Sequence, residues 1–492
     1  MCGAGLCLGY ALLGACWLVR KCESEVRDVA RRQIPILAVA VVHSGKSVAI
    51  LCLAFNKEAT NTGLSFDNFE PSILRSTTMF SRRDLLAASA MGAAMTVSAA
   101  NAGSYGNPDQ PPEGAINAKN PASVTDPGPQ DPAIRDQLQS AFSPPPTDVG
   151  GMPQIWSSFN TVQRRVQNGG WARQVTQADF AISTTITGVN MRLTAGGIRE
   201  LHWHQAAEWA YMTYGHCRVT VIDPMGRPYV ADVKEGDIWY FPAGYPHSLQ
   251  GLGPDGCEFV ICFDAGDASE FNTLLVTDWI AHAPPSVLAT NFGVPAETFA
   301  KTPLHNLWIF QGKVPGDLES VRKAMTGSAG SPPEPFTFSL ATSPNLNGTK
   351  SGTLHLADSN TFKVSTTIAA VVQTVPPGAT RAMHWHPNAD EWQYYIKGKA
   401  RMGVFNTGPH VLTMDFNPGD IGYVPKNYGH YVQNIGDTDM QFFSVFRTSN
   451  FQEFSLSDWL KHSPAEMVAQ HLNVDPTMVP RWPGANARIM PE

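Results

Sequence analysis

Short runs of hydrophobic residues alternate with turn-forming residues along the part of the chain after residue 150. The clearest runs are rich in Val, Ile, Thr and Phe: CRVTVID (217–223), EFVICFD (258–264), KVSTTIAAVVQTV (363–375) and QFFSVF (441–446). Such compositions favour strands. Gly- and Pro-containing turn signals lie between them, at DPMGRP (223–228), PAGYP (242–246) and NPGD (417–420). Short strands separated by such turns predict a β-sandwich or a barrel.

A set of potential metal ligands occurs twice in this strand-rich part. The first copy comprises His202, His204, Glu208 and His247. The second comprises His384, His386, Glu391 and His430. The copies are 182 residues apart at the first His and 183 residues apart at the Glu and at the last His. A single His-x-His pair is weak evidence, but two sets in nearly the same register predict a repeated domain with one metal site in each copy.

The spacing within each set has a geometric reason. Residues i and i+2 of a strand point to the same face, so each His-x-His pair aims two imidazoles into one cavity. The last His lies roughly forty residues further on and must come from another strand of the same barrel. Three imidazoles and one carboxylate suit Mn, Fe, Zn or Cu better than Mg or Ca.

The residues around both ligand sets resemble the two cupin motifs. In the first half these are Gly196, His202, His204, Glu208 and Gly215, followed by Gly236, Pro242, Gly244 and His247. In the second half they are Gly378, His384, His386, Glu391 and Gly398, followed by Gly419, Pro425, His430 and Asn434. Gly251 and Asn427 depart from the pattern. The resemblance implies an all-β fold of two tandem cupin (jelly-roll, double-stranded β-helix) barrels with short peripheral helices, at 151–320 and 330–492.

Within the cupins, the chain resembles the bicupin oxalate decarboxylases. The resemblance runs through residues 196–248 and continues in FDAGDASEFNTLLVTDWIAHAP (263–284). It implies a manganese-dependent enzyme, with two Mn²⁺ per chain, that splits oxalate into formate and carbon dioxide and uses dioxygen as a transient electron acceptor. It also implies a homo-oligomer, either a trimer or a hexamer.

The same resemblance suggests roles for three further residues. The family has a Ser-Glu pair near the start of a flexible lid, which here is Ser269-Glu270, and this implies that Glu270 transfers the proton. Arg199 stands where the family has a substrate-facing arginine, and Arg381 repeats that placement in the second half. A guanidinium can hold a carboxylate of oxalate in a forked contact. Alternatively, Glu270 is a solvated loop carboxylate and Arg199 is an ordinary strand arginine in a structural ion pair.

The two halves differ in their candidate proton carriers. The family often has a glutamate fourteen residues after the last His ligand of the second half, where this chain has Ser444. The segment after it offers only Glu453, which is displaced relative to the lid pair. We therefore expect turnover at the first site and a structural or electron-transfer role for the second. Trp203 and Trp385, which lie between ligands, are expected to pack in the core.

Two other functions remain open from the sequence. An oxalate oxidase uses the same ligands but releases hydrogen peroxide, and a storage or ligand-binding bicupin has no catalysis. Nucleic acid is not an expected partner, because the chain has a net charge of −7 and no basic patch.

The N-terminal part carries no cupin pattern. Residues 79–102 contain Arg82-Arg83, an apolar stretch and a small-residue cleavage site ending at Ala102, which resembles a bacterial twin-arginine signal peptide. The alternative is an amphipathic helix followed by a linker. The signal implies export to the periplasm or the medium, without stable membrane association after cleavage. Residues 1–78 are an upstream extension of doubtful status, either a wrongly extended start or a membrane anchor, and 103–150 is a Pro-rich arm that we expect to wrap a neighbouring subunit.

Overall fold

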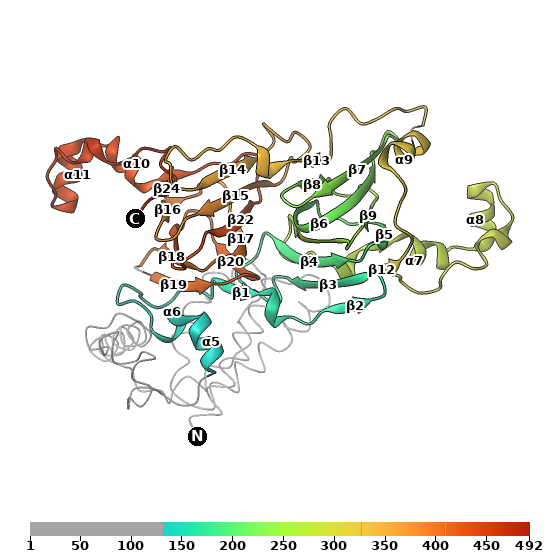
Figure 1. Cartoon of the computed structure of the whole chain (residues 1–492), viewed down its shortest axis with the longest axis horizontal. Coiled ribbons are helices and arrows are strands. Elements are labelled where there is room, and N and C mark those ends of the chain that lie inside the picture. Colours follow the sequence, from blue (N-terminus) through green and yellow to red (C-terminus); the bar gives the residue numbers. More distant parts are fainter. Residues whose placement is uncertain (1–130, 326, 409) are drawn as a thin grey trace, which may run out of the picture. The chain divides into compact units, whose positions relative to one another are not determined.

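The computed structural model describes residues 131–325, 327–408 and 410–492, and these form two β-rich units with a few short helices (Figure 1). The all-β prediction with two similar barrels is therefore confirmed. The predicted upstream extension (1–78), the signal (79–102) and residues 103–130 of the arm lie outside the described residues.

The first unit consists of two facing sheets that share one long strand. Its strands are β2 (Arg165–Gln167), β3 (Gly170–Val175), β4 (Thr187–Leu193), β5 (Gly197–Trp203), β6 (Glu208–Ile222), β7 (Pro228–Lys234), β8 (Ile238–Phe241), β9 (His247–Gly251), β10 (Cys257–Phe263), β11 (Leu274–Leu275) and β12 (Ile309–Gln311). The first part of β6 pairs with β8 and β10, and its second part pairs with β7 and β9. Because β6 belongs to both sheets, it closes the sandwich into a barrel.

The second unit repeats this plan with separate strands. They are β14 (Thr353–Ala357), β15 (Ala369–Val375), β16 (Thr380–Trp385), β17 (Glu391–Lys397), β18 (Ala400–Asn406), β19 (His410–Phe416), β20 (Asp420–Val424), β21 (Gly429–Asn434), β22 (Met440–Phe446), β23 (Phe454–Ser455) and β24 (Ile489–Met490). One sheet has the order β20-β17-β22-β15-β14, and the other has the order β19-β18-β21-β16-β23. Strands β17 and β18 together correspond to the single strand β6.

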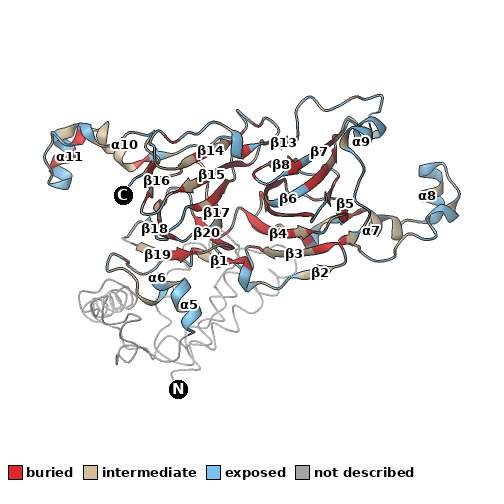
Figure 2. Ribbon diagram, in the orientation of Figure 1, coloured by how far each residue is buried: buried red, intermediate tan, exposed pale blue. Residues whose placement is uncertain are grey.

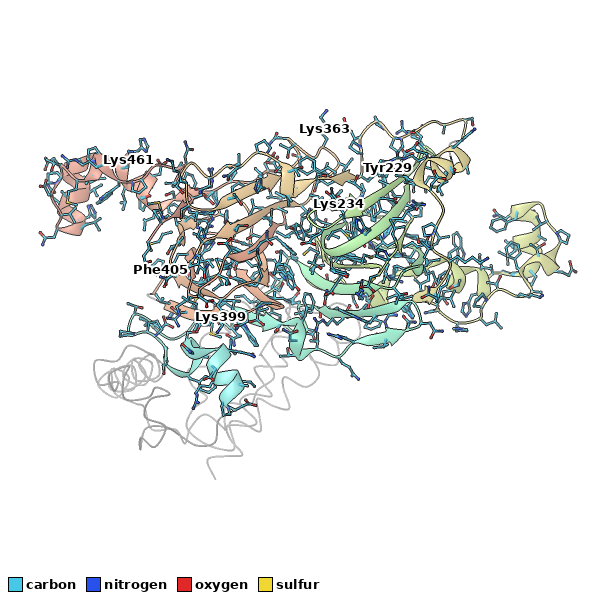
Figure 3. All side chains as sticks on the ribbon, in the orientation of Figure 1. Tyr229, Lys234, Lys363, Lys399, Phe405 and Lys461 are labelled. Atoms are coloured by element: carbon cyan, nitrogen blue, oxygen red, sulfur yellow. The ribbon has the colours of Figure 1, made fainter. Side chains whose placement is uncertain are left out.

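Each unit receives one short strand from the chain that leads into the other unit. Strand β1 (Trp156–Ser158) precedes the first unit but pairs with β20 of the second. Strand β13 (Thr337–Phe338) precedes the second unit but pairs with β8 of the first. Tyr229, labelled on β7 in Figure 3, reinforces this contact. Its hydroxyl lies 2.7 Å from the Thr337 hydroxyl, and the two groups share a hydrogen bond. The two units are therefore tied by a reciprocal exchange of edge strands.

The two units also share a hydrophobic core. One cluster of buried residues joins Trp209 and Val260 of the first unit to Trp392 and Phe443 of the second. Trp209 and Phe443 are in direct ring contact, with centroids 5.4 Å apart. Burial of these aromatic faces stabilises the pair of units as one body. Figure 2 shows that buried residues concentrate on the strands of both units.

The helices are short and lie outside the barrels. They are α5 (Pro132–Gln137), α6 (Gln139–Phe142), α7 (Val276–Ala281), α8 (Pro285–Phe292), α9 (Leu318–Met325), α10 (Leu456–Lys461) and α11 (Ala465–Leu472), together with the 3₁₀ turns η4 (Phe159–Thr161), η5 (Glu270–Asn272), η6 (Ala296–Phe299), η7 (Leu340–Thr342) and η8 (Val479–Arg481). None of the helices in the described ranges has the length and apolar character to cross a bilayer.

The described end of the Pro-rich arm contacts its own chain. Helix α6 packs beside β19, and the Ser140 amide donates to the Asp415 carboxylate. The Asp148 carboxylate accepts from both the amide and the hydroxyl of Thr413. Residues 140–148 of the arm therefore have partners in the second unit of the same chain, and the predicted contact of the arm with a neighbouring subunit stays a prediction.

Candidate metal centres and lid

The four predicted ligands of the first unit converge inside the barrel. His202 is the penultimate residue of β5, His204 follows that strand, Glu208 begins β6 and His247 begins β9. His202 and His247 are direct partners in the β5–β9 ladder. One potential ligand atom from each of the four side chains lies within 4.8 Å of the others, and all four residues are buried. The strand register thus assembles the site predicted from the spacing.

The second unit assembles an equivalent cluster from His384, His386, Glu391 and His430, which are also buried. His384 and His430 are ladder partners in β16 and β21. Among the described residues, these two clusters are the groups with the composition and closeness of a metal site.

All six ligand imidazoles are oriented by the backbone. The Nδ1 atom of each ring lies 2.5–3.1 Å from a carbonyl oxygen. An Nδ1–H that donates to a carbonyl leaves Nε2 with its lone pair, which is the tautomer that ligates a metal. The Nε2 atoms of His247 and His386 are buried without a hydrogen-bond partner among the described residues. A cation at each cluster would satisfy them.

The carboxylates that complete the clusters are fixed by the imidazoles and by one further donor each. Glu208 Oε2 lies 3.2 Å from His204 Nε2 and 3.5 Å from His247 Nε2, and its Oε1 accepts from the Trp239 indole at 2.8 Å. Burial by itself would raise the pKa of Glu208, but the neighbouring imidazoles outweigh it and hold that pKa below its ordinary value. Burial lowers the pKa of His202 well below 6.5, and Arg199 adds to this effect. A neutral imidazole and an anionic carboxylate are the forms that bind a divalent transition metal.

The second carboxylate is held in the same way by different neighbours. Glu391 Oε2 lies 3.1 Å from His386 Nε2 and 2.7 Å from His430 Nε2, and Oε1 accepts from the Gln393 amide at 2.9 Å. Burial opposes ionisation here too, but His430 and His386 keep the pKa of Glu391 well below its ordinary value. Both donor sets therefore fit a metal such as manganese.

Arg199 lies beside the first cluster with its guanidinium buried. Its Nη1 donates to the Trp308 carbonyl at 3.2 Å and its Nη2 to the Thr273 hydroxyl at 3.4 Å, and the group lies 5.3 Å from the Trp308 ring centroid. No carboxylate of the described residues is within ion-pair distance of it. Burial lowers the pKa of Arg199, and the nearby Glu270 carboxylate is the largest influence in the opposite direction. The alternative of a structural ion pair is not what the geometry shows.

Glu270 lies in the segment predicted to be a lid, which is anchored to the barrel. The Ser269 hydroxyl caps the 3₁₀ turn η5, and Gln174 accepts from the Glu270 amide at 3.1 Å. The carboxylate is only 4% exposed, and its Oε1 is 2.9 Å from Arg165 Nη2. Its Oε2 is buried and has no hydrogen-bond partner among the described residues. This is a buried acid with one free oxygen, and not the solvated loop carboxylate that was the alternative.

Arg165 holds the lid from the barrel side. Its guanidinium lies 4.7 Å from the Trp308 ring centroid and 5.7 Å from that of Phe271, which is itself in the lid. Nothing in the local sequence marks this arginine, because it comes from the short edge strand β2, far from both cupin motifs.

The arginine of the second site is already paired. Arg381 forms a close ion pair through Nη2 with Glu453 Oε2, and its Nε donates to the Gln373 amide oxygen at 2.6 Å. Ser444, in the position of the family's second-site glutamate, hydrogen-bonds with Gln373 at 3.3 Å. The sequence interpretation of Glu453 as merely displaced missed this contact.

The prediction that the tryptophans between the ligands pack in the core is wrong, because Trp203 and Trp385 are only partly buried. Trp203 packs edge-on against Trp279 of α7, and Trp385 packs against Trp459 of α10. They therefore anchor the peripheral helices and are not part of the barrel cores.

Comparisons with known proteins agree with this geometry. A family model described as Cupin matches residues 158–299 and 338–480. The chain is 46% identical over 331 residues to oxalate decarboxylase OxdC of Bacillus subtilis, which covers 67% of this chain and 85% of the relative. It is 37% identical over 334 residues to a probable oxalate decarboxylase of Arthroderma benhamiae, covering 67% and 81%.

A solved structure of the Bacillus subtilis oxalate decarboxylase, from a study of its Mn(II) centers, superimposes with a TM-score of 0.72 at 42% identity. The match covers 74% of this chain and 96% of that chain. The chain therefore belongs to the cupin family and, within it, to the two-domain oxalate decarboxylases.

Proposed function

We propose that the protein is an oxalate decarboxylase that converts oxalate and one proton into formate and carbon dioxide at the first site. The observation that carries this proposal is that a buried acid, Glu270, and an arginine without a carboxylate partner among the described residues, Arg199, both lie beside a complete ligand cluster. The relatives named above are oxalate decarboxylases, which supports the same substrate here.

Arg199 binds the substrate in this proposal. Within residues 131–325, 327–408 and 410–492 its guanidinium has two hydrogen-bond partners, and both are neutral, a carbonyl and a hydroxyl. A buried cation without an anion is costly, so a small dianion that enters the site gains a charge-assisted contact. The Trp308 and Thr273 contacts hold the planar group in one orientation, which fixes the substrate for reaction.

Glu270 moves the proton. Singly protonated oxalate and formate differ by one carbon dioxide, so the hydrogen on a carboxyl oxygen must finish on carbon. Glu270 Oε2, which has no hydrogen-bond partner in the described part of the chain, accepts that proton, while Oε1 stays on Arg165 at 2.9 Å. After the carbon–carbon bond breaks, Glu270 returns the proton to the one-carbon fragment.

Manganese bound by the His and Glu ligands, with dioxygen as a transient electron acceptor, would supply the reversible one-electron oxidation that makes the carbon–carbon bond cleavable. The closed lid keeps water and further dioxygen from the one-carbon fragment, which directs it to formate instead of peroxide-forming oxidation.

Purified protein incubated with oxalate at about pH 5 and assayed for formate and hydrogen peroxide together tests the proposal. Formate in near-equal amount to the oxalate consumed is the expected result. Peroxide as the main product would assign the protein to the oxalate oxidases, and no turnover with both sites loaded would assign it to the non-catalytic bicupins.

We also propose that the protein is exported through its twin-arginine-type signal and forms a trimer or hexamer. The internal Arg82-Arg83 motif supports export. Exposed apolar side chains on the peripheral helices support assembly, since Trp279 is 67% exposed and Trp459 is 55% exposed. Sedimentation of the mature protein would test the oligomeric state.

A further inference from the structure

The carboxylate of Glu453 is directed at the second ligand cluster. Its side chain is 5% exposed, and its Oε2 lies 3.7 Å from Nε2 of His384. The Nδ1 atom of that ring contacts the Ala382 carbonyl at 2.6 Å. Glu453 therefore approaches Nε2, which is the nitrogen that faces the ligand cluster. A second anionic side chain, in addition to Glu391, therefore reaches this site.

Three contacts hold Glu453 in this position. Arg381 Nη2 pairs with Oε2, and Arg488 Nε lies 3.4 Å from Oε1. The preceding residue, Gln452, accepts a hydrogen bond from Nδ1 of the ligand His386 at 2.8 Å. The segment that carries Glu453 is thus part of the scaffold that orients the ligands, and the carboxylate is anchored between two arginines.

The strand register identifies the corresponding residue of the first unit. Leu275 of β11 pairs with His202, and Ser455 of β23 pairs with His384. The residues two positions earlier are Thr273 and Glu453. Both contact the arginine of their own site, since the Thr273 hydroxyl is 3.4 Å from Arg199 Nη2. A neutral hydroxyl in one site therefore stands where the other has a carboxylate.

The difference in lid length produces this contrast. Ten residues separate β10 from β11, but seven separate β22 from β23. The longer connection of the first unit forms the 3₁₀ turn that pairs Glu270 with Arg165, so that Glu270 lies near Arg199 but outside ion-pair distance of it. The shorter connection has no such turn, and its glutamate falls directly on Arg381.

We propose that Glu453 is a built-in carboxylate that occupies the anion position of the second metal site and closes this site to oxalate and other small dicarboxylates. Arg381 is the counterpart in the second site of the substrate-binding Arg199. Its positive charge is neutralised by the Glu453 carboxylate of the same chain. This inference rests on the proposed function in one respect, namely that Arg199 marks the anion position of the first site. Glu453 is accordingly a determinant of which site turns over.

The test uses manganese-loaded protein with one functional site at a time. His202→Ala/His204→Ala leaves the second site, and His384→Ala/His386→Ala leaves the first. The Mn(II) electron paramagnetic resonance spectrum is recorded during oxalate titration. We expect oxalate to change the first-site spectrum and to leave the second-site spectrum unchanged at concentrations that saturate the first. Glu453→Thr, which copies the first site, should make the second-site spectrum respond, with at least about tenfold tighter apparent binding.

A reciprocal variant keeps the inference testable where loss of a buried ion-pair partner impairs folding. Thr273→Glu places a carboxylate beside Arg199 and should weaken oxalate binding at the first site by about tenfold or more, with normal metal content. Glu453→Gln keeps the size of the side chain and should give an intermediate response.

An oxalate-induced change at the second site with Glu453 intact would overturn the inference. Absence of formate production by the first site alone would instead refute the proposed function, and the spectra would still report on Glu453.

Discussion

Replacing Glu270 with Gln removes the proposed proton carrier while keeping nearly the same shape in the lid. Two losses follow from the structure. The first is proton transfer, for which a positioned side chain contributes about 100-fold or more, or about 2.7 kcal/mol of the barrier. The second is the charge of the 2.9 Å contact with Arg165, whose side chain is 20% exposed. With the discount for solvent screening, this contact contributes about 1 kcal/mol, or about fivefold in lid closure. The expected fall in formate production is therefore about 500-fold.

The matched control is Arg165→Gln, which breaks the same ion pair and leaves the acid in place. It should lower formate production by only about fivefold, because only lid closure is weakened. Formate and peroxide are measured together for both variants, with manganese content checked by elemental analysis. The ratio of peroxide to formate should rise in Glu270→Gln much more than in the control. Equal losses in the two variants, with unchanged product ratios, would show that Glu270 acts by closing the lid and not by carrying the proton.

Four further outcomes are expected. His202→Ala should remove about one of two manganese ions per chain, as should His384→Ala, because each residue belongs to a separate cluster; elemental analysis checks this. Arg199→Lys should lower kcat/KM for oxalate by about 10-fold or more, since a point charge cannot replace the planar fork; steady-state assays check this. Burial lowers the pKa values of His202 and His384 well below 6.5 in the folded state, so the unfolded chain binds more protons in acid. The melting temperature of metal-free protein should therefore be highest above about pH 6.5 and fall as the pH is lowered toward about 5, which calorimetry would show. N-terminal sequencing of exported protein should begin after Ala102, and a mature protein that retained Met1 would contradict the predicted boundary.

The parts of the site that follow strand periodicity could be predicted from the sequence. A His-x-His pair in a strand fixes two side chains on one face, so the eight ligands could be grouped without coordinates. The turns that separate the hydrophobic runs likewise predicted a barrel. The paired Glu453 could not be recognised in this way. Glu453 lies 23 residues after His430, just as Glu270 lies 23 residues after His247. The two carboxylates nevertheless reach different arginines, because three residues separate Glu270 from the next strand, β11, whereas Glu453 is followed directly by β23.

The links between the units also lacked a sequence signal. Strands β1 and β13 have three and two residues, too short for a period to be seen, and their partners are more than 90 residues away. Arg165 was missed for a related reason, because it reaches the lid by folding and not by proximity along the chain. Contacts of this kind depend on register and packing, which the local pattern does not encode.

The reciprocal exchange of β1 and β13 couples the folding of the two units. A metal ion in the second ligand cluster would therefore contribute to the stability of both units, even without taking part in the reaction. When one unit unfolds, the other loses a short edge strand and part of the shared aromatic core, so unfolding of either unit destabilises the other. A ligand that binds only the folded form stabilises whatever unfolds together with its site. At a free metal concentration of 100 times the dissociation constant this amounts to about 2.7 kcal/mol. Metal bound beside Glu391 would therefore also stabilise the segment around Glu270 and Arg199 of the first unit against unfolding, although it is held by the second unit.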